Sequence, residues 1–536
     1  MIRDFCEFDE HAIVTADVCI VGSGAAGITL AREFIGTRFS VLMLEGGGLE
    51  AEGETQKLYD SEVVGLPHTG VHEGRARVFG GTTTLWGGQA LRLDAFDFQK
   101  KSWIPFSGWP ISREELEPFY DRADRVLHLG PRISYRDLCV TFGFQAPAFD
   151  PSRLYMECSQ WSPKPNFATT YRRELKGASN VQVLLHANVT SIITNSSAVA
   201  VEQIEFQTLT GKNGTAKARF YVICCGGIET ARLLLASDRV EPQGLGNKHD
   251  LVGRFFQEHI HIRLGDLQTN GRKCLQEFFE SFYRNGLKYF PVIALSRSVQ
   301  AEKQLLSVHG SAMFDDVKDS GIVALKQLFR ILRRGTKGET GELQRFLRDA
   351  LVSPGDLCRL GYRFYFQKRS GTPRQGPIYI GAQVEVAPNP DSRVTLGKAR
   401  DRLGMRKVKL DWRIGEFERR TLHEYIWTVA SEFERLGLAF FDLNQVAFLD
   451  DSVAWVRMAH DSAHHMGTTR MHENPQQGVV DADCRVHGVN NLYIGSSAVF
   501  PTSACSNPTL TILALCLRIA DKLKSDLSNC AGAYQV

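Results

Sequence analysis

Apolar runs alternate with a glycine-rich turn near the start of the chain. An apolar, β-rich run at 17–21 ends at a glycine-rich turn at 22–27, and residues 28–35 then have helical character. A second apolar run at 40–44 ends at Glu45. The pattern predicts a strand, a turn, a helix and a second strand, in the order of a dinucleotide-binding unit.

The glycines of this turn have separate expected roles. Gly22 permits a tight turn, Gly24 lets the backbone approach a pyrophosphate, and Gly27 lets the helix and strand pack closely. Ala25 and Ala26 belong to the turn, and the N-terminus of the helix that follows is expected to face the phosphates.

Glu45 stands where an acidic side chain accepts hydrogen bonds from the adenosine ribose hydroxyls. The same unit serves NAD and FAD, so it does not name the cofactor. A glycine-rich turn that binds nothing is the alternative, and the presence of both strands, the helix and the acid favours a binding site.

Further apolar runs continue the predicted sheet. Runs at 181–185 and 189–193 predict a strand pair or one bent strand, and the run at 220–225 predicts a buried strand. Gly226-Gly227 separates that strand from a predicted helix at 228–237, which again places backbone near a nucleotide.

A second glycine-rich stretch, residues 77–88, has glycine pairs on both sides of three threonines. Such backbone can pass close to a flat or anionic ligand, with hydroxyl groups available as donors. A tight surface loop is the alternative, and this stretch alone does not separate the two.

The length indicates more than one hydrophobic core. The chain has 536 residues, of which 43% are hydrophobic. From about 260 to 445 the glycine motifs cease. We therefore expect residues 1–255 and 446–536 to form one nucleotide-binding domain, with a substrate or cap domain at 256–445 inserted between its two parts.

Charge and cysteine content exclude several classes of protein. The formal charge of +3 gives no sign of a nucleic-acid partner, although residues 326–374 hold 12 Lys+Arg against 4 Asp+Glu. This basic segment is expected to be a solvated helical face, with a docking surface for a membrane or an anionic partner as the alternative.

The 12 cysteines lack C-x-x-C spacing, which argues against a zinc site. Together with an N-terminus that does not resemble a signal peptide and the lack of a long apolar run, they predict a cytoplasmic protein without a membrane span.

The most informative motifs stand near the end of the chain. They are His464-His465-Met-Gly-Thr468, Asn491-Leu-Tyr-Ile-Gly495-Ser496 and Ser506-Asn507-Pro-Thr509-Leu-Thr. With the first glycine-rich turn, the 77–88 stretch and Gly226-Gly227, they make the chain resemble the glucose-methanol-choline (GMC) oxidoreductases, which are FAD enzymes. The H-x-x-G-T and N-P-T-L-T forms are similar to the pyranose-oxidase-like branch. The resemblance is thin over residues 260–445.

The resemblance implies an α/β fold, α+β overall. A Rossmann-like FAD-binding domain would carry an inserted substrate-binding domain built on an antiparallel sheet with helices. FAD is the implied cofactor and no metal is expected. The residues expected to hold FAD are Gly22, Gly24, Ala25, Ala26, Gly27, Glu45, Arg77, Gly80, Gly81, Thr82, Trp86, Gly87, Val189, Gly226, Gly495, Ser496, Asn507 and Thr509.

The resemblance also places the chemistry. His464 of H-x-x-G-T is the expected base that takes the hydroxyl proton while hydride leaves for flavin N5, since a neutral imidazole suits that task. Asn507 is the expected partner that orients the substrate oxygen, and a helix expected at 509–519 would direct its N-terminus at the flavin. His465 is the alternative base if the match to the family motif is shifted by one residue.

Departures from the family sharpen these expectations. Leu85 stands before Trp86, where pyranose oxidases have a histidine bonded to the flavin, so FAD is expected to be non-covalent. Ser496 replaces an acidic residue of many members. His465, Gln383 and Glu385 are candidates for the substrate side. A structural role is expected for His259, which lies in a recurrent family segment.

The expected function is oxidation of an alcohol group of a sugar, glycoside or polyol to a carbonyl, with oxygen, a quinone or another carrier as the electron acceptor. A bulkier alcohol, such as a sterol or an aromatic alcohol, is the nearest alternative. A non-redox FAD lyase comes next, and a non-catalytic nucleotide-fold binding protein is the least favoured because it needs no base and orienting group. The sequence leaves the oligomeric state open.

Overall fold

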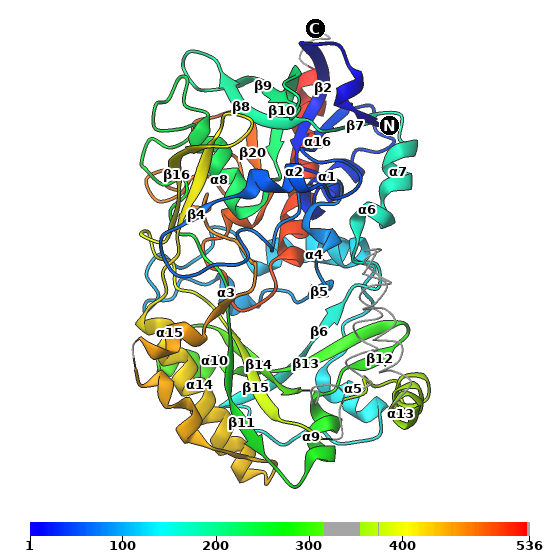
Figure 1. The fold of residues 1–536 in the computed structure, drawn as a ribbon, viewed down its shortest axis with the longest axis vertical. Helices are drawn as coiled ribbons and strands as arrows, with labels where there is room; N and C mark the ends of the chain where they lie inside the picture. The colour runs from blue at the N-terminus through cyan, green and yellow to red at the C-terminus, as the bar shows by residue number, and fades with distance from the viewer. Residues whose placement is uncertain (316–353, 373–374, 452, 533–536) are drawn as a thin grey trace.

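The computed structural model describes residues 1–315, 354–372, 375–451 and 453–532, whose strands form three sheets (Figure 1). The first sheet lies in the upper part of Figure 1 and the large antiparallel sheet in the lower part. Of the basic segment at 326–374, residues 326–353, 373 and 374 lie outside the described residues.

The first sheet has a parallel centre. Its eight strands within the described residues are β1 (Ile2–Asp4), β2 (Ala12–Val21), β3 (Val41–Leu44), β7 (Val181–Leu185), β8 (Asn188–Thr194), β9 (Val201–Gln207), β10 (Asn213–Ile223) and β20 (Leu492–Ile494). The order is β1-β7-β3-β2-β10-β9-β8, and β20 pairs with β10. Every residue of β3 is buried, as expected for a parallel strand covered on both faces.

Two expectations about this sheet have different outcomes. The strand, turn, helix and strand predicted for the start of the chain are present as β2, α1 and β3. Strands are present at both 181–185 and 189–193, as β7 and β8, but they neither pair with each other nor form one bent strand, because β7 lies between β1 and β3 whereas β8 pairs with β9. His186, between the two strands, has a φ of 55°, and the chain leaves the parallel centre there.

Helices cover the sheets. Within the described residues they are α1 (Ala25–Arg32), α2 (Gly53–Gln56), α3 (Ala95–Phe98), α4 (Arg113–Val126), α5 (Tyr135–Thr141), α6 (Phe167–Thr170), α7 (Arg172–Gly177), α8 (Gly226–Ala236), α9 (Arg272–Phe279), α10 (Arg297–Glu302), α13 (Pro354–Tyr365), α14 (Glu416–Arg435), α15 (Ala454–Met458) and α16 (Thr509–Gly532). Helices α1, α4 and α16 pack together, and α8 packs against β8 and β16. Among the described residues, no helix is both long enough and apolar enough to cross a lipid bilayer.

The second sheet is antiparallel. Its strands within the described residues are β5 (Gln89–Ala90), β6 (Leu154–Trp161), β11 (Ile260–Gln268), β12 (Phe282–Arg284), β13 (Leu287–Leu295), β14 (Val308–Phe314), β15 (Ile378–Val384), β18 (Phe440–Phe441) and β19 (His460–Asp461). The long helix α14 packs against β14 and β15. The third sheet has the order β16 (Arg393–Arg400), β17 (Arg406–Asp411) and β4 (Glu62–Val63).

The fold class expected from the sequence is confirmed, with a Rossmann-like sheet and a separate antiparallel sheet. The domain limits stay a prediction. Strands β5, β6 and β19 come from the chain assigned to the nucleotide-binding domain yet belong to the antiparallel sheet. Conversely, β17 from the expected insertion pairs with β4 from near the N-terminus.

Candidate active site

A cavity of about 540 Å³ lies at the carboxyl ends of the parallel strands, where Val21 ends β2 and Leu44 ends β3. This edge of a parallel sheet is where such folds bind ligands. Many residues singled out from the sequence line the cavity: Gly22, Gly24, Ala25, Ala26, Glu45, Arg77, Gly81, Thr82, Trp86, Val189, Gly226, His464, His465, Ser496 and Thr509.

The three glycines of the first turn have the geometry that their expected roles require. Gly22 has a φ of 99°, which favours glycine. A Cβ on Gly27 would lie 1.9 Å from the carbonyl oxygen of Gly22, so any side chain would force the helix away from the turn. A Cβ on Gly24 would meet nothing within 4 Å, which leaves its backbone open to a ligand.

Glu45 ends β3 at the wall of the cavity and is held by its own chain. Its Oε2 accepts hydrogen bonds from the backbone N–H and the hydroxyl of Ser23, at 3.0 and 2.6 Å, and its Oε1 accepts one from Gly47 N–H at 2.9 Å. Burial raises the pKa of Glu45 above its usual value, although these hydrogen bonds oppose the shift. The carboxyl group is therefore fixed in place, with lone pairs left for a ligand hydroxyl.

Within the described part of the chain, several residues that were expected to hold FAD or substrate do not line this cavity. Gly80, Gly87 and Gly495 pack closely, since a Cβ on each would lie 2.7 Å from Ala168, 2.6 Å from the Trp161 ring and 3.0 Å from Cys224 Sγ, respectively. Gly27 and Asn507 are likewise absent from its lining, as are Gln383 and Glu385.

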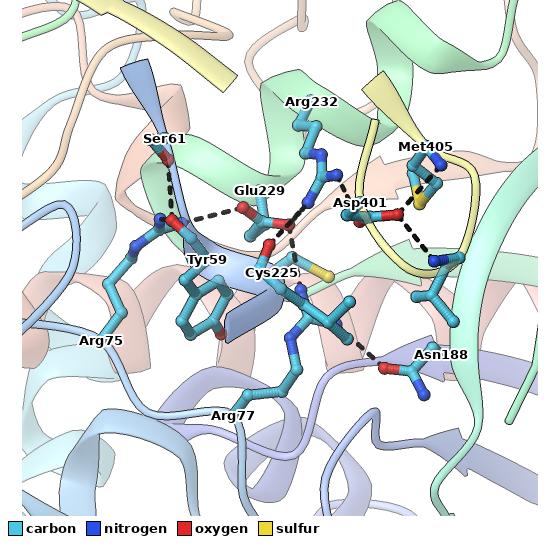
Figure 2. A network of polar contacts seen from close by, with 12 residues as sticks. Tyr59, Ser61, Arg75, Arg77, Asn188, Cys225, Glu229, Arg232, Asp401 and Met405 are labelled. Atoms are coloured by element: carbon cyan, nitrogen blue, oxygen red, sulfur yellow. Dashed lines mark hydrogen bonds and ion pairs between the residues drawn. The ribbon is translucent and has the colours of Figure 1, made fainter. Parts of the chain in front are cut away.

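A polar network that sequence reasoning missed forms one wall of the cavity (Figure 2). Glu229 of α8 accepts hydrogen bonds from Arg75 at 2.9 Å, from Arg77 at 3.1 Å and from Arg232 at 3.3 Å. Arg232 also donates to Asp401 at 2.6 Å, in the loop between β16 and β17. Burial alone would raise the pKa of Glu229, but the three arginines outweigh burial and hold that pKa at about 2.

The sequence signals for this network were Arg77, expected from the resemblance, and the position of Glu229 in the first turn of the helix after Gly226-Gly227. The remaining members come from segments far apart in the chain. Tyr59 completes the wall, with the guanidinium carbons of Arg75 and Arg77 at 4.1 and 4.6 Å from the centre of its ring.

His464 lies at another part of the cavity wall, in the segment that follows β19. Its Nε2 is 3.4 Å from Asn507 Nδ2 and its Nδ1 is 2.9 Å from His259 Nδ1. Burial, and then the nearby imidazoles of His259 and His309, place the pKa of His464 well below its usual value. The structure thus brings together the predicted pair, His464 and Asn507, and adds His259.

His465 has different surroundings. A Cβ on Gly227 would lie 2.3 Å from the backbone oxygen of His465, so the start of α8 packs directly on this peptide. That oxygen also accepts a hydrogen bond of 2.6 Å from Ser497 Oγ. The His465 ring Nε2 lies 3.8 Å from Glu258 Oε2 and has no hydrogen-bond partner among the described residues.

Gln383 and Glu385 contact protein groups. Gln383 Nε2 donates to the carbonyl of Cys505 at 2.7 Å, and Glu385 Oε1 accepts from Ala504 N–H at 3.2 Å. Glu385 Oε2 accepts from Ser307 N–H at 3.0 Å. Both side chains therefore fasten the loop before Asn507 to the antiparallel sheet, and contact with a substrate stays a prediction.

The chain matches two family models. One, described as FAD dependent oxidoreductase, matches residues 17–286, about half of the chain. The other, described as GMC oxidoreductase, matches residues 388–516, which include His464 and Asn507.

Curated relatives and solved structures are similar over nearly the whole chain. The chain is 24% identical to 2-methyl-1,2-propanediol dehydrogenase of Mycolicibacterium austroafricanum, covering 96% of each protein. It is 23% identical to the fructose dehydrogenase large subunit of Gluconobacter japonicus, covering 96% of this chain and 99% of that protein. The crystal structure of pyridoxine 4-oxidase from Mesorbium loti superposes with a TM-score of 0.54 at 16% identity, covering 94% of this chain and 98% of that one.

Proposed function

Because the chain belongs to the GMC family of FAD-dependent oxidoreductases, we propose that it oxidises an alcohol group of a sugar, glycoside or polyol to a carbonyl. The observation that carries this proposal is the placement of His464 at the cavity wall with the Asn507 amide beside its Nε2. A base beside the cavity can take a hydroxyl proton, and an amide next to that base can hold the substrate oxygen in line.

FAD fits the cavity. The open backbone at Gly24 admits a pyrophosphate, the N-terminus of α1 follows directly, and the fixed carboxyl group of Glu45 faces the same space. Leu85, which also lines the cavity, cannot form a bond to the flavin, so we infer that FAD is held non-covalently. Release of the flavin into solution on acid precipitation checks this, and colour retained in the pellet contradicts it.

His464 and Asn507 carry the proposed steps. His464 Nε2 takes the proton from the substrate hydroxyl, and the Asn507 amide holds the substrate oxygen in line. His464 is neutral near physiological pH because burial lowers its pKa, so it is ready to accept a proton. When bound, FAD supplies the acceptor for the hydride that leaves the carbon bearing the substrate hydroxyl. Helix α16, which begins at Thr509, directs its N-terminal dipole at the cavity wall.

The proposed substrate class is supported by the relatives. One is named for a diol and another for fructose, which are both polyhydroxylated. The final electron acceptor is oxygen, a quinone or another carrier.

We also propose a cytoplasmic location on the basis of the scattered cysteines. Fractionation of the source cells tests it, and recovery of the protein outside the cytoplasm contradicts it.

An anaerobic screen tests the function. Purified holoprotein is mixed with sugars, glycosides, polyols, sterols and aromatic alcohols, and bleaching of the flavin absorbance is recorded. Bleaching by polyhydroxylated compounds supports the proposal. Bleaching by sterols or aromatic alcohols alone overturns the substrate class, whereas flavin that no alcohol bleaches points to lyase chemistry. Protein purified without flavin and unable to bind FAD overturns the redox function.

The roles of the two adjacent histidines are tested by His464→Ala and His465→Ala. We expect His464→Ala to keep FAD but lose flavin reduction by about 10²- to 10⁴-fold, the contribution of a general base. His465→Ala should lose much less, because the His465 ring is directed at Glu258. Stopped-flow reduction, with FAD content measured for each variant, distinguishes them. The reverse order of losses would show that His465 is the base.

A further inference from the structure

The two histidines His259 and His464 face each other across a short antiparallel pairing. Gln257 and Met466 exchange two backbone hydrogen bonds, each 3.0 Å long. Counting outward from that pair places Glu258 opposite His465 and His259 opposite His464. The contact between the two imidazoles, with 2.9 Å between their Nδ1 atoms and ring planes at 85°, is therefore set by the backbone register.

One carboxylate fixes this pairing. Glu258 Oε1 accepts hydrogen bonds from the backbone N–H of His259 at 2.8 Å and of His464 at 2.7 Å. The same oxygen thus holds the peptides of both histidines, and the Glu258 side chain is fully buried. The pair sits on a rigid support rather than on a mobile loop.

The neighbouring cluster of Glu258, His68 and His465 has the composition of a metal site, with their ligand atoms within 4.8 Å of one another. Proton positions argue against that use. His68 Nδ1 accepts a hydrogen bond from Val71 N–H at 3.0 Å, so a neutral His68 carries its proton on Nε2. That protonated Nε2 lies 3.3 Å from Glu258 Oε2, at ion-pair distance, and its proton leaves it no lone pair for a metal ion. The cluster is better explained as support for the Glu258 carboxylate.

The same reasoning sets the protons of the His259 and His464 pair. His259 Nε2 is 3.4 Å from the carbonyl oxygen of Ser503, which can only accept, so Nε2 carries the proton. In a neutral imidazole the other nitrogen is then an acceptor. Burial lowers the pKa of His259 to about 4, which keeps that ring neutral.

The chain of donors continues to the cavity. Because His259 Nδ1 accepts, His464 Nδ1 must donate across the 2.9 Å contact. His464 Nε2 is then left with its lone pair, at the position where Asn507 Nδ2 approaches to 3.4 Å. The opposite tautomer would place two lone pairs against each other at His259 and a proton where the substrate proton has to go.

We propose that His259 is a positioning residue that fixes His464 in the tautomer with a free Nε2, and that supports the charged ring after it accepts the substrate proton. In that step the substrate O–H bond breaks and an Nε2–H bond forms, while His464 Nδ1–H stays bonded to His259 Nδ1. Bound FAD would accept the hydride from the substrate carbon, so the substrate would lose one proton to His464 and one hydride to the cofactor. This inference rests on the proposed function, since it requires His464 to be the base.

The pair His259→Asn and His259→Leu tests this role. Asparagine can place Oδ1 near the position of Nδ1 and keep an acceptor, whereas leucine fills the space without one. We expect His259→Leu to reduce flavin about tenfold to a hundredfold more slowly, a part of what a general base supplies, with substrate affinity changed by less than about threefold. His259→Asn should recover most of that loss. A packing role predicts no advantage of asparagine over the apolar residue.

The tautomer itself gives a readout that does not depend on activity. In holoprotein labelled with ¹⁵N-histidine, assigned with the His464→Ala variant, we expect His464 to show a protonated Nδ1 and an unprotonated Nε2. A protonated Nε2 overturns the inference, as do equal reduction rates for the two His259 variants. If His464→Ala reduces flavin at the wild-type rate, His464 is not the base and the inference falls, whereas the proposed function fails only if no alcohol bleaches the flavin of the wild-type holoprotein. If wild-type His464 has the expected tautomer but His259→Leu reduces flavin at the wild-type rate, the positioning role of His259 is overturned and the role of His464 stands.

Discussion

At the scale of single residues, the site depends on buried groups whose charge is set by their neighbours. Glu229 illustrates this, because one carboxylate accepts hydrogen bonds from three arginines at the wall of the cavity (Figure 2). Sequence reasoning found Arg77 by resemblance but not its partners. The contacts of Glu229 join α8 to the segment around residue 75, and no local pattern encodes such a long-range contact.

Replacing Glu229 by glutamine should destabilise the holoprotein by about 3 kcal/mol, because it leaves buried arginines without their counter-charge. Glu229→Gln keeps the shape of the side chain, so the loss reports charge. Urea unfolding followed by flavin fluorescence measures it, with exposed Glu50→Gln as a control expected to stay within about 0.5 kcal/mol. Equal stability of Glu229→Gln and Glu50→Gln would contradict a stabilising role for the charge of Glu229.

The same variant should change the pH dependence of stability. The pKa of Glu229 in the folded protein, about 2, lies below its ordinary value of 4.5, so its contribution is complete above that ordinary value and is lost as pH falls towards 2. As the pH is lowered from 5 to 3, the melting temperature should therefore fall less in Glu229→Gln than in the wild type.

At the scale of elements, the local pattern predicted strand, turn and helix types well and their limits less well. Strand β2 begins at Ala12 rather than near residue 17, because residues 12–16 pair with β10. Helix α16 extends to Gly532, well past the expected end near residue 519, with Leu523 and Leu527 buried. In both cases tertiary contacts extend an element beyond what its own sequence predicts.

The first glycine-rich turn allows a prediction that separates folding from cofactor binding. Gly27→Ala should destabilise the protein by about 1 to 3 kcal/mol or more, because its Cβ would collide with the Gly22 carbonyl. Gly24→Ala should leave the thermal stability of the apoprotein nearly unchanged but weaken FAD binding about tenfold or more, because its Cβ projects into open space at the cavity.

Apoprotein melting and FAD titration measure the two effects separately. Gly53→Ala, at a glycine where a Cβ also meets nothing within 4 Å but which lies outside the cavity lining, is the matched control for both measurements. Unchanged FAD affinity in Gly24→Ala would contradict the placement of the pyrophosphate at this turn.

At the scale of the whole molecule, the site joins two sheets. His464 and Asn507 come from the C-terminal part of the chain, whereas the turn with Gly24 comes from its beginning, and β20 connects them by pairing with β10. Sequence motifs placed these residues in one site by resemblance alone. They did not reveal how the antiparallel sheet holds the loop before Asn507, because Gln383 and Glu385 were expected to face substrate.

That loop contains a strained residue. Ala504 has a φ of 48°, in the left-handed region that costs a non-glycine residue about 1 kcal/mol or more. Its N–H donates to Glu385 Oε1, and Gln383 holds the next carbonyl, that of Cys505. The antiparallel sheet therefore holds the loop in a conformation that it would not adopt alone, three residues before Asn507.

Glu385→Gln tests whether this support positions Asn507. A carboxylate accepts from both Ala504 and Ser307, whereas an amide turns its NH₂ group towards one of those N–H donors and leaves it unpaired, at a cost of about 1 to 3 kcal/mol. We expect a lower melting temperature and about tenfold slower flavin reduction, since small misplacements of a catalytic group are costly. Adding Ala504→Gly relieves the positive φ and should restore part of the stability. If the melting temperature falls while the reduction rate stays at the wild-type value, Glu385 supports the fold without positioning Asn507.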